Sequence, residues 1–246
     1  MKKLTIVIPT TLSPDLYSLL NNLHDNVSDC QIYLVIDGKK HLSDTIQEEL
    51  DIFANILRGR NIDLHQIVLP YSVGEGGFYS HRAIAGFAHL VNTEYVCFLD
   101  QDNLVGPYHF EEMLMKMNKY PELPFCYSYR TIVDKDGKFI CDDECESLGW
   151  KPIMGKEENG YLVDTSCWLY RTEFIRKYSF IWHNGWGADR IFTMNMRKLV
   201  GQEVMEKACT GIPSLLYRLG GNPGSVQKEF FLTGNDQMRM LESNGG

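Results

Sequence analysis

Short apolar runs rich in β-branched residues alternate with longer amphipathic segments in the first third of the chain. The runs span residues 4–8, 31–36 and 64–69, and their length and composition are typical of buried strands. The segments between them have helical length. The first is expected to begin at Ser13 and Pro14, because Ser can cap a helix and Pro suits its first turn.

The second intervening segment, residues 43–57, carries a single apolar stripe. Its members are spaced three or four residues apart, at Ile46, Leu50, Phe53 and Leu57. This spacing places them on one face of a helix. Strands that alternate with helices indicate a parallel sheet with right-handed crossovers. The chain is therefore expected to be an α/β protein, with a mixed but mainly parallel sheet flanked by helices.

A fourth strand is predicted at residues 95–99, whose unbroken apolar run is typical of burial on both faces of a sheet. A Gly-rich loop, 71–77, and a small-residue helix, 78–91, precede it. The strand is followed directly by Asp100, Gln101, Asp102 and Asn103. Because ligands of open α/β sheets bind outside the carboxyl ends of the strands, these two carboxylates are positioned for chemistry rather than packing.

The remaining pattern is less regular. A polar stretch at 141–160 is interpreted as a surface loop over the sheet edge. The other expected elements are a helix at 108–120, a strand at 125–133, a turn at 135–138, a strand at 166–170, a short helix, a longer helix ending near Val200, a strand at 214–218 and a turn at 220–224.

The composition fits one soluble folded domain, with 246 residues, 44% of them hydrophobic and 23% charged. The formal net charge of −8 argues against a broad surface for nucleic acid or anionic lipid. Seven scattered cysteines favour a reducing, cytoplasmic location; Cys141 and Cys145 lack the second pair that a zinc site requires. The apolar run that ends at Pro9 is too short for a signal peptide or membrane span, which leaves peripheral membrane contact open.

The acidic pair Asp100 and Asp102 is the strongest chemical signal. A nucleotide-sugar donor carries two adjacent phosphates, and cleavage of its glycosidic bond develops negative charge on the departing diphosphate. A hard divalent cation held by carboxylates stabilises that charge, and it also allows an acidic protein to bind a polyanion. An Asp-x-Asp sequence alone is also a common turn, so the inference depends on its position after a buried strand.

Four segments, in this order and spacing, resemble the nucleotide-binding half of a GT-A glycosyltransferase, most closely family 2. They are residues 5–10, residues 35–38, the Gly-rich loop with its helix, and residues 98–103. The resemblance covers residues 1–110 and implies that residues 111–246 form the acceptor-binding half of a single domain. It also implies a nucleotide diphosphate sugar as donor, with UDP-sugar expected, and Mn²⁺ or Mg²⁺ as the metal.

The resemblance also implies roles for individual residues. Pro9, Thr10 and Thr11 would line the base and ribose, and Asp37 would accept a hydrogen bond from the uracil ring. Asp102 would bind the metal directly, while Asp100 would assist it or face the ribose. The remaining residues expected at the donor are Gly74, Glu75, Gly76, Arg82 and Gln101. Asp37 is also a plain turn former, and a solvated helix arginine is the alternative for Arg82.

A second informative stretch, residues 183–190, resembles the Trp-Gly-x-Glu-Asp region of inverting GT-A enzymes. Inversion needs a carboxylate that removes the acceptor hydroxyl proton, and Asp189 matches that base. Trp186 offers a flat face for a pyranose ring, and Gly187 lets the backbone approach the sugar. Ala188 replaces the acidic residue that the family usually has there. Asp189 could instead serve only to stabilise a helix N-terminus.

Two later positions are ambiguous. Asp164 falls where such enzymes often place donor-sugar contacts, but it also suits a turn. Residues 216–225 resemble a late family segment, Tyr-Arg-x-His-Gly-x-Ser, without its histidine, and no histidine follows His183. A third metal ligand is therefore unassigned, and a retaining reaction is less favoured.

Other classes of protein fit less well. A sugar-phosphate nucleotidyltransferase would carry a Gly-rich run with Arg and Lys after the first strand, where residues 10–13 read Thr-Thr-Leu-Ser. A dehydrogenase would carry Gly-x-Gly-x-x-Gly there. A non-catalytic nucleotide-sugar-binding module stays open. The sequence therefore predicts an inverting, metal-dependent glycosyltransferase that acts on a saccharide or other hydroxyl acceptor.

Overall fold

The computed structural model describes residues 2–220 and 226–244 of the chain. These residues pack as two compact units. Among the described residues, the first unit contains 2–102 and 169–188, and the second contains 103–168, 189–220 and 226–244. Each unit is described by itself below. The assignment of the whole chain to one domain stays a prediction.

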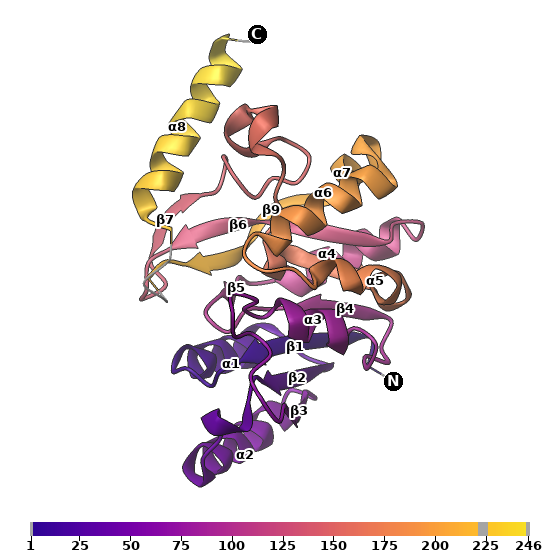
Figure 1. The fold of residues 1–246 in the computed structure, drawn as a ribbon, viewed down its shortest axis with the longest axis vertical. Helices are drawn as coiled ribbons and strands as arrows, with labels where there is room; N and C mark the ends of the chain where they lie inside the picture. The colour runs from indigo at the N-terminus through magenta and orange to yellow at the C-terminus, as the bar shows by residue number, and fades with distance from the viewer. Residues whose placement is uncertain (1, 221–225, 245–246) are drawn as a thin grey trace. The chain divides into compact units, whose positions relative to one another are not determined.

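The first unit is built on five strands in the order β3-β2-β1-β4-β8. Figure 1 labels the first four of them. Their bounds are β1 (Leu4–Thr10), β2 (Cys30–Ile36), β3 (Asp63–Val68), β4 (Tyr95–Phe98) and β8 (Trp168–Arg171). The first four strands are parallel to one another, and β8 pairs antiparallel with β4. Every residue of β1 and β4 is buried, as the unbroken apolar runs predicted. The α/β prediction is therefore confirmed.

Helices join these strands as the periodicity predicted. Their bounds are α1 (Asp15–Asn26), η1 (Lys39–His41), α2 (Asp44–Arg58), α3 (His81–Phe87), α5 (Thr172–Tyr178) and η5 (Ser179–Trp182). Ser43 caps α2, since its Oγ accepts a hydrogen bond from the Ile46 amide. The predicted cap by Ser13 is wrong: α1 has no side-chain cap, and the Ser13 carbonyl accepts from the Leu16 amide instead.

The helix predicted at 78–91 is shorter than expected, because α3 begins only at His81. Gly74 accepts hydrogen bonds from the amides of Phe78 and Tyr79 in a turn that precedes the helix. Tyr79 itself has a positive φ of 51°, which is outside the helical region. The Gly-rich loop thus extends further along the chain than its sequence indicated.

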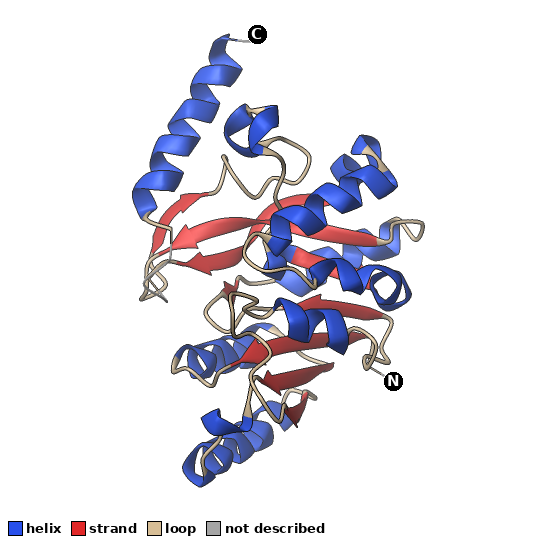
Figure 2. Cartoon of the chain, in the orientation of Figure 1, coloured by secondary structure: helices blue, strands red, loops and turns tan. Residues whose placement is uncertain are grey.

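The second unit contains a smaller sheet in which β9 lies between β6 and β5, and β7 pairs with β6. The strands are β5 (Leu104–Val105), β6 (Phe125–Val133), β7 (Phe139–Asp142) and β9 (Cys209–Arg218). The helices are α4 (His109–Lys119), η2 (Ile153–Gly155), η3 (Glu157–Asn159), η4 (Thr165–Cys167), α6 (Ala188–Val200), α7 (Gln202–Ala208) and α8 (Lys228–Asn244). Figure 2 shows helices and strands by colour.

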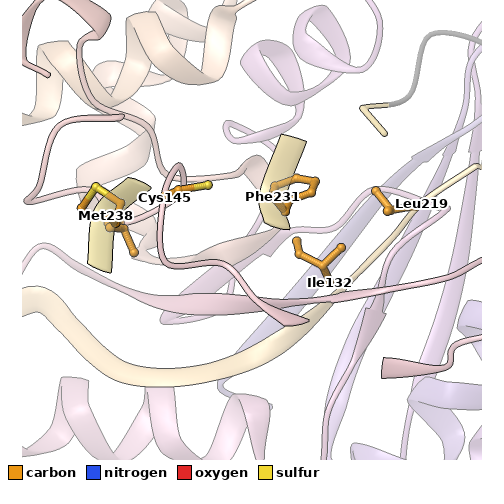
Figure 3. Packing of buried hydrophobic residues seen from close by; sticks show 6 residues of the cluster. Ile132, Cys145, Leu219, Phe231 and Met238 are labelled. Carbon is orange, nitrogen blue, oxygen red and sulfur yellow. The ribbon is translucent and has the colours of Figure 1, made fainter. Parts of the chain in front are cut away.

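The interpretation of residues 141–160 as a surface loop is wrong in part. The stretch begins within β7, and Asp143, Cys145 and Ser147 are buried. Its apolar members join a core cluster that contains Ile132, Cys145, Leu148, Leu219, Phe231 and Met238. Figure 3 shows five of these side chains with their labels. A polar sequence is buried here because charged partners are buried with it, as the site below shows.

Helix α8 supplies Phe231 and Met238 to this cluster and has no counterpart among the predicted elements. Gly234 lies inside the helix and weakens its sequence signal. A Cβ at Gly234 would lie 2.6 Å from the sulfur of Cys145, so the close approach of the two segments requires glycine. Most of the turn predicted at 220–224 lies outside the described residues.

All seven cysteines are free thiols, and six of them are buried. Burial raises the pKa of the Cys30 thiol to about 12. Among the residues that the structure describes, no three His, Cys, Asp or Glu side chains gather as a metal site. This finding also holds for the segment around Cys141 and Cys145. No helix of the described chain is long and apolar enough to cross a membrane.

Replacement of Phe231 by Ala tests whether α8 belongs to the core of the second unit. The side chain is fully buried, so its truncation should lower the free energy of unfolding by about 3–5 kcal/mol. Leu232 is the matched control, because it is the next residue of the same helix and is exposed. Its replacement by Ala should cost under about 1 kcal/mol. Equal losses for the two variants in urea titrations would contradict this packing.

Candidate functional site

The strand register of the first unit brings its polar strand ends together. Thr10 at the end of β1 pairs with Ile36 of β2, and Val7 of β1 pairs with Phe98 of β4. Asp37 and Asp100 therefore follow strands that lie on either side of β1. This is the edge of a parallel sheet at which α/β proteins bind ligands.

Side chains tie the end of β1 to the acidic turn after β4. The Thr10 hydroxyl donates to Gln101 Oε1 over 2.5 Å, and Gln101 Nε2 donates to Thr11 Oγ1 over 3.3 Å. Pro9 lies within β1 opposite Val35 and is buried. The three residues predicted to line the base and ribose are thus next to the predicted metal-binding turn.

Asp37 holds the Gly-rich loop in place. Its Oδ1 accepts from the amide of Val73 over 2.6 Å. Its Oδ2 accepts from the Ser72 hydroxyl over 2.8 Å and from the Gly74 amide over 3.0 Å. Hydrogen bonds to a buried carboxylate are among the stronger ones in proteins. Asp37 therefore has a role in loop geometry that its sequence context did not indicate.

The Gly-rich loop needs glycine at Gly74 for reasons of space. A Cβ there would lie 2.4 Å from the Tyr79 carbonyl oxygen and 2.8 Å from Asp37 Oδ2, which are distances that real Cβ atoms do not adopt. Gly76 has a positive φ of 77°, which favours glycine for conformational reasons. Between them, Glu75 forms an exposed ion pair with Lys40 at 2.6 Å.

The acidic turn itself contains Asp100 and Asp102, both half-buried. Asp100 Oδ1 accepts a hydrogen bond from the Ser80 hydroxyl over 3.2 Å, just before α3 begins. Two carboxylates in one turn fit a hard cation that takes its other ligands from phosphate oxygens and water, as Mg²⁺ usually does. They do not make a complete protein cage, which agrees with the lack of a three-ligand group in the described chain.

Arg82 lies against an aromatic ring. Its guanidinium carbon is 3.2 Å from the centroid of Phe78, and its Nη1 donates to the Val73 carbonyl over 3.4 Å. The side chain is half-buried, and its Nε is out of contact with solvent. Contact with a diphosphate stays a prediction.

His81 is a positioning residue that the sequence analysis did not single out. Its buried ring stacks on Trp182 at 5.8 Å, and Nδ1 lies 3.2 Å from the carbonyl oxygen of Asn184. Burial lowers the pKa of His81, although its backbone contacts raise it. A neutral ring whose Nδ1–H donates to this carbonyl therefore fixes the start of the 183–187 loop to α3.

The 183–187 loop meets the Gly-rich loop within the first unit. A Cβ on Gly185 would lie 3.1 Å from the carbonyl oxygen of Gly77, so the two backbones approach closely. Trp186 at the tip of the loop is 82% exposed, and Gly187 has a positive φ of 80°. A large exposed aromatic face of this kind is suited to a sugar ring. Ala188 is fully buried, so the acidic residue usual in the family would be out of solvent here.

Asp164 and Asp189 belong to the second unit. Asp164 is buried, and both carboxylate oxygens have partners: Oδ2 accepts from Arg130 Nη1 and Oδ1 from the Ser166 amide. Asp189 lies in the first turn of α6, where its Oδ1 accepts from the Arg190 amide over 2.7 Å. This contact agrees with a helix-terminal role for Asp189.

The pKa of Asp189 is raised above its ordinary value. Burial is the largest cause, and the negative charge of Asp164 adds to it. The Arg190 amide and the charges of Arg130 and Arg190 act in the opposite direction. A carboxylate with a raised pKa is a stronger base than a solvated one, which suits proton removal near neutral pH.

Arg130 was missed as a site residue by the sequence analysis. It lies inside β6 among buried residues, and its guanidinium contacts Asp164. The available signal was an arginine within a nine-residue run that otherwise reads as a buried strand. Because an arginine is buried only with partners, this position required acidic residues elsewhere in the chain. The sequence could not show which ones.

The chain has the fold of the GT-A glycosyltransferases, as comparison with solved structures shows. One match is S. aureus TarS 1-349 in complex with UDP-GlcNAc, with a TM-score of 0.60 and 15% identity over 97% of this chain and 66% of that one. Another is the mannosyltransferase PcManGT from Pyrobaculum calidifontis in complex with GDP-Man and Mn²⁺, with a TM-score of 0.54 and 13% identity over 90% of this chain and 58% of that one. No family model and no curated protein sequence matches the chain. The resemblance inferred from the sequence is thus confirmed at the level of fold.

Replacement of Gly74 by Ala tests the geometry of the Gly-rich loop. The added methyl would clash with the Tyr79 carbonyl and with Asp37, which should cost about 1–3 kcal/mol of unfolding free energy. Exchange of the Val73 and Gly74 amide protons should also become faster. Gly86 is the control, since a methyl there meets open space on α3 and should stabilise the helix by about 0.5–1 kcal/mol. A Gly74 variant as stable as the wild type would contradict the loop geometry.

Proposed function

We propose that the protein is an inverting, metal-dependent glycosyltransferase that moves a sugar from a nucleotide diphosphate sugar, with UDP-sugar as the preferred donor, to an acceptor hydroxyl. The observation that carries the proposal is the arrangement at the carboxyl ends of β1, β2 and β4. There, hydrogen bonds link Thr10 and Thr11 to Gln101, inside the acidic turn. The GT-A fold and the nucleotide sugars bound by both neighbours support it.

In the proposed donor complex, Pro9, Thr10 and Thr11 contact the base and ribose, and Asp37 contributes both to the base and to the geometry of the Gly-rich loop. Gly74, Glu75 and Gly76 bring their backbone toward the donor, and Arg82 approaches the diphosphate. Backbone N–H groups carry a partial positive charge, so this loop would bind the diphosphate without a cluster of cationic side chains. That suits a chain with a net charge of −8. We place Gln101 beside the ribose.

Asp102, with Asp100, would hold Mn²⁺ or Mg²⁺ against the donor. When bound, such a cation neutralises the negative charge that develops on the diphosphate leaving group. The second neighbour carries Mn²⁺ with its nucleotide sugar, which supports the metal part of the proposal. Asp100 Oδ1 also accepts a hydrogen bond from the Ser80 hydroxyl, which helps to orient this carboxylate.

Asp189 is the proposed base. It would remove the proton of the acceptor hydroxyl while that oxygen attacks the anomeric carbon from the face opposite the diphosphate, which inverts the configuration. Trp186 would stack on a pyranose ring, and Gly187 would allow the backbone to approach the sugar. Asp164 would contact the donor sugar. Because Ala188 is buried and uncharged, the acceptor would be recognised without the acidic residue that usually precedes the base.

The seven free thiols support a reducing, cytoplasmic location as part of the proposal. Acceptors that reside at a membrane surface would then be reached by peripheral contact.

Replacement of Asp102 by Ala tests the donor and the metal together. The wild type should be stabilised by UDP-sugar with Mn²⁺, by about 2.7 kcal/mol at ~100 times Kd, because ligand binding to the folded state adds to its stability. A thermal-shift panel of UDP-, GDP- and CDP-sugars with and without Mn²⁺ measures this. The Asp102 variant should lose the metal-dependent part of the shift. Asp136→Ala removes a carboxylate from an exposed turn and should keep the full shift; loss in both variants would point to unspecific charge effects.

Replacement of Asp189 by Asn tests the base. The variant should bind the donor as the wild type does, but its kcat for sugar transfer should fall by about 10²–10⁴. Asp44→Asn is a matched control, because Asp44 also lies in the first turn of a helix and is exposed. It should cost about 0.3–1 kcal/mol of stability and no turnover. If Asp189→Asn transfers sugar at the normal rate, Asp189 is a helix-terminal residue only; if the wild type binds donors but never transfers, the protein is a binding module.

A further inference from the structure

The second unit buries one guanidinium among several carboxylates. The side chain of Arg130 is 3% exposed. Its Nε donates to Asp143 and its Nη1 to Asp164, each over 2.8 Å, and its Nη2 donates to Glu146. The guanidinium also lies over the rings of Tyr217 and Phe231, at 4.4 and 5.3 Å. These contacts use the planar fork of an arginine, which a lysine cannot reproduce.

Stability alone gives a weak reason for such a cluster. The desolvation of buried ions offsets most of their attraction, and apolar residues of similar volume often stabilise a core as well or better. Asp143 is fully engaged, since its oxygens also accept from the amides of Cys145, Glu146 and Ser147. Burial would raise the pKa of Asp143, but Arg130 and these amides lower it, so it stays ionised.

The segment that contains Asp164 is fixed to the first turn of α6. The Val163 amide donates to the Thr193 hydroxyl over 2.9 Å, and that hydroxyl donates to the Asp189 carbonyl over 2.9 Å. Thr193 is fully buried. The contact between Arg130 and Asp164 therefore determines where a negative charge lies with respect to Asp189.

Charges of both signs face Asp189 from the elements around it. They are Arg130 of β6, Asp164, Glu146 and the adjacent Arg190. The carboxylates of Asp164 and Glu146 oppose ionisation of Asp189, whereas the two arginines favour it. Burial raises the pKa of Glu146, and Arg130 lowers it while Asp143 raises it. The buried cation Arg130 thus favours the ionised form of Asp143, Glu146 and Asp189, and it donates a hydrogen bond to Asp164.

We propose that Arg130 is a positioning residue of the transfer reaction: its guanidinium holds Asp164, and with it the segment that Thr193 ties to the first turn of α6, where the proposed base Asp189 lies. This inference rests on the proposed role of Asp189 as the base, because only a base has to lose its proton before the reaction. Arg130 itself touches neither donor nor acceptor in this scheme. The negative charge of Asp164 raises the pKa of Asp189, and the positive charge of Arg130 lowers it.

Two substitutions separate this role from a merely structural one. Glu146→Gln removes a negative charge that opposes ionisation, so Asp189 should titrate at lower pH. Arg130→Lys keeps one charge but loses the fork that engages Asp164 and Glu146 together. The negative charges of these two carboxylates are then less well offset, so Asp189 should titrate at higher pH and kcat should fall about tenfold or more. Glu144→Gln is the matched control. Glu144 lies two residues from Glu146 but pairs with the exposed Arg239, and its replacement should leave the titration of Asp189 unchanged.

The titration is measured by carboxyl ¹³C NMR, with the Asp189 signal assigned by its loss in Asp189→Asn, and in parallel by the acid limb of the pH profile of kcat. Opposite displacements of the Asp189 titration in the Glu146 and Arg130 variants would support the inference. Titration curves that coincide with those of the wild type and of Glu144→Gln would overturn it, even if stability changes. If Arg130→Lys fails to fold, the Glu146 variant decides. Unimpaired transfer by Asp189→Asn would instead overturn the proposed function and leave the NMR result intact.

Discussion

The pairing of β1 with β2 and β4 is the constraint on which the donor half of the candidate site depends. Parallel pairing aligns the carboxyl ends of the three strands, so that residues far apart in the chain end at one edge. Asp37, Thr10 and Asp100 then need only short turns to reach it. Since the three strands are buried, a slip in register would expose apolar residues as well as separate the polar ones. Core packing and site geometry are therefore specified together.

Carboxylates serve in three different ways in this acidic chain, and their partners decide which. Asp37 accepts hydrogen bonds from a hydroxyl and two amides, so it organises a loop. Asp143 and Asp164 share a buried arginine, so they organise the interior of the second unit. Asp100 and Asp102 lie half-buried in one turn, and their proposed role is to hold a cation. The same residue type thus fills structural and chemical roles, separated by burial and by the donors at hand.

The predictions from sequence succeeded where one local pattern decided the outcome. The apolar stripe through Leu50 and Leu57 predicted α2, and an unbroken apolar run predicted β4. The predictions failed where a residue distant in sequence determined the local structure. Ser13 does not cap α1. The helix before β4 starts three residues late, because the Gly74 carbonyl accepts from the Phe78 and Tyr79 amides in a turn. Helix α8 carries a glycine because Cys145 packs closely against it. The polar stretch 141–160 looked solvent-exposed because its cation, Arg130, lies on another strand.

The sequence by itself determined the α/β class, the order of strands and helices in the first unit, and the acidic turn after β4, because hydrophobic periodicity and turn chemistry are local properties. It also indicated a GT-A glycosyltransferase through the order of short motifs. Only the tertiary structure decided which carboxylate oxygens accept hydrogen bonds within the protein and that His81 anchors the Trp186 loop. It also decided that the guanidinium of Arg130 donates hydrogen bonds to several buried carboxylates. Those facts depend on contacts between residues remote in sequence, and the free energy of a buried charge is set by such contacts rather than by its neighbours along the chain.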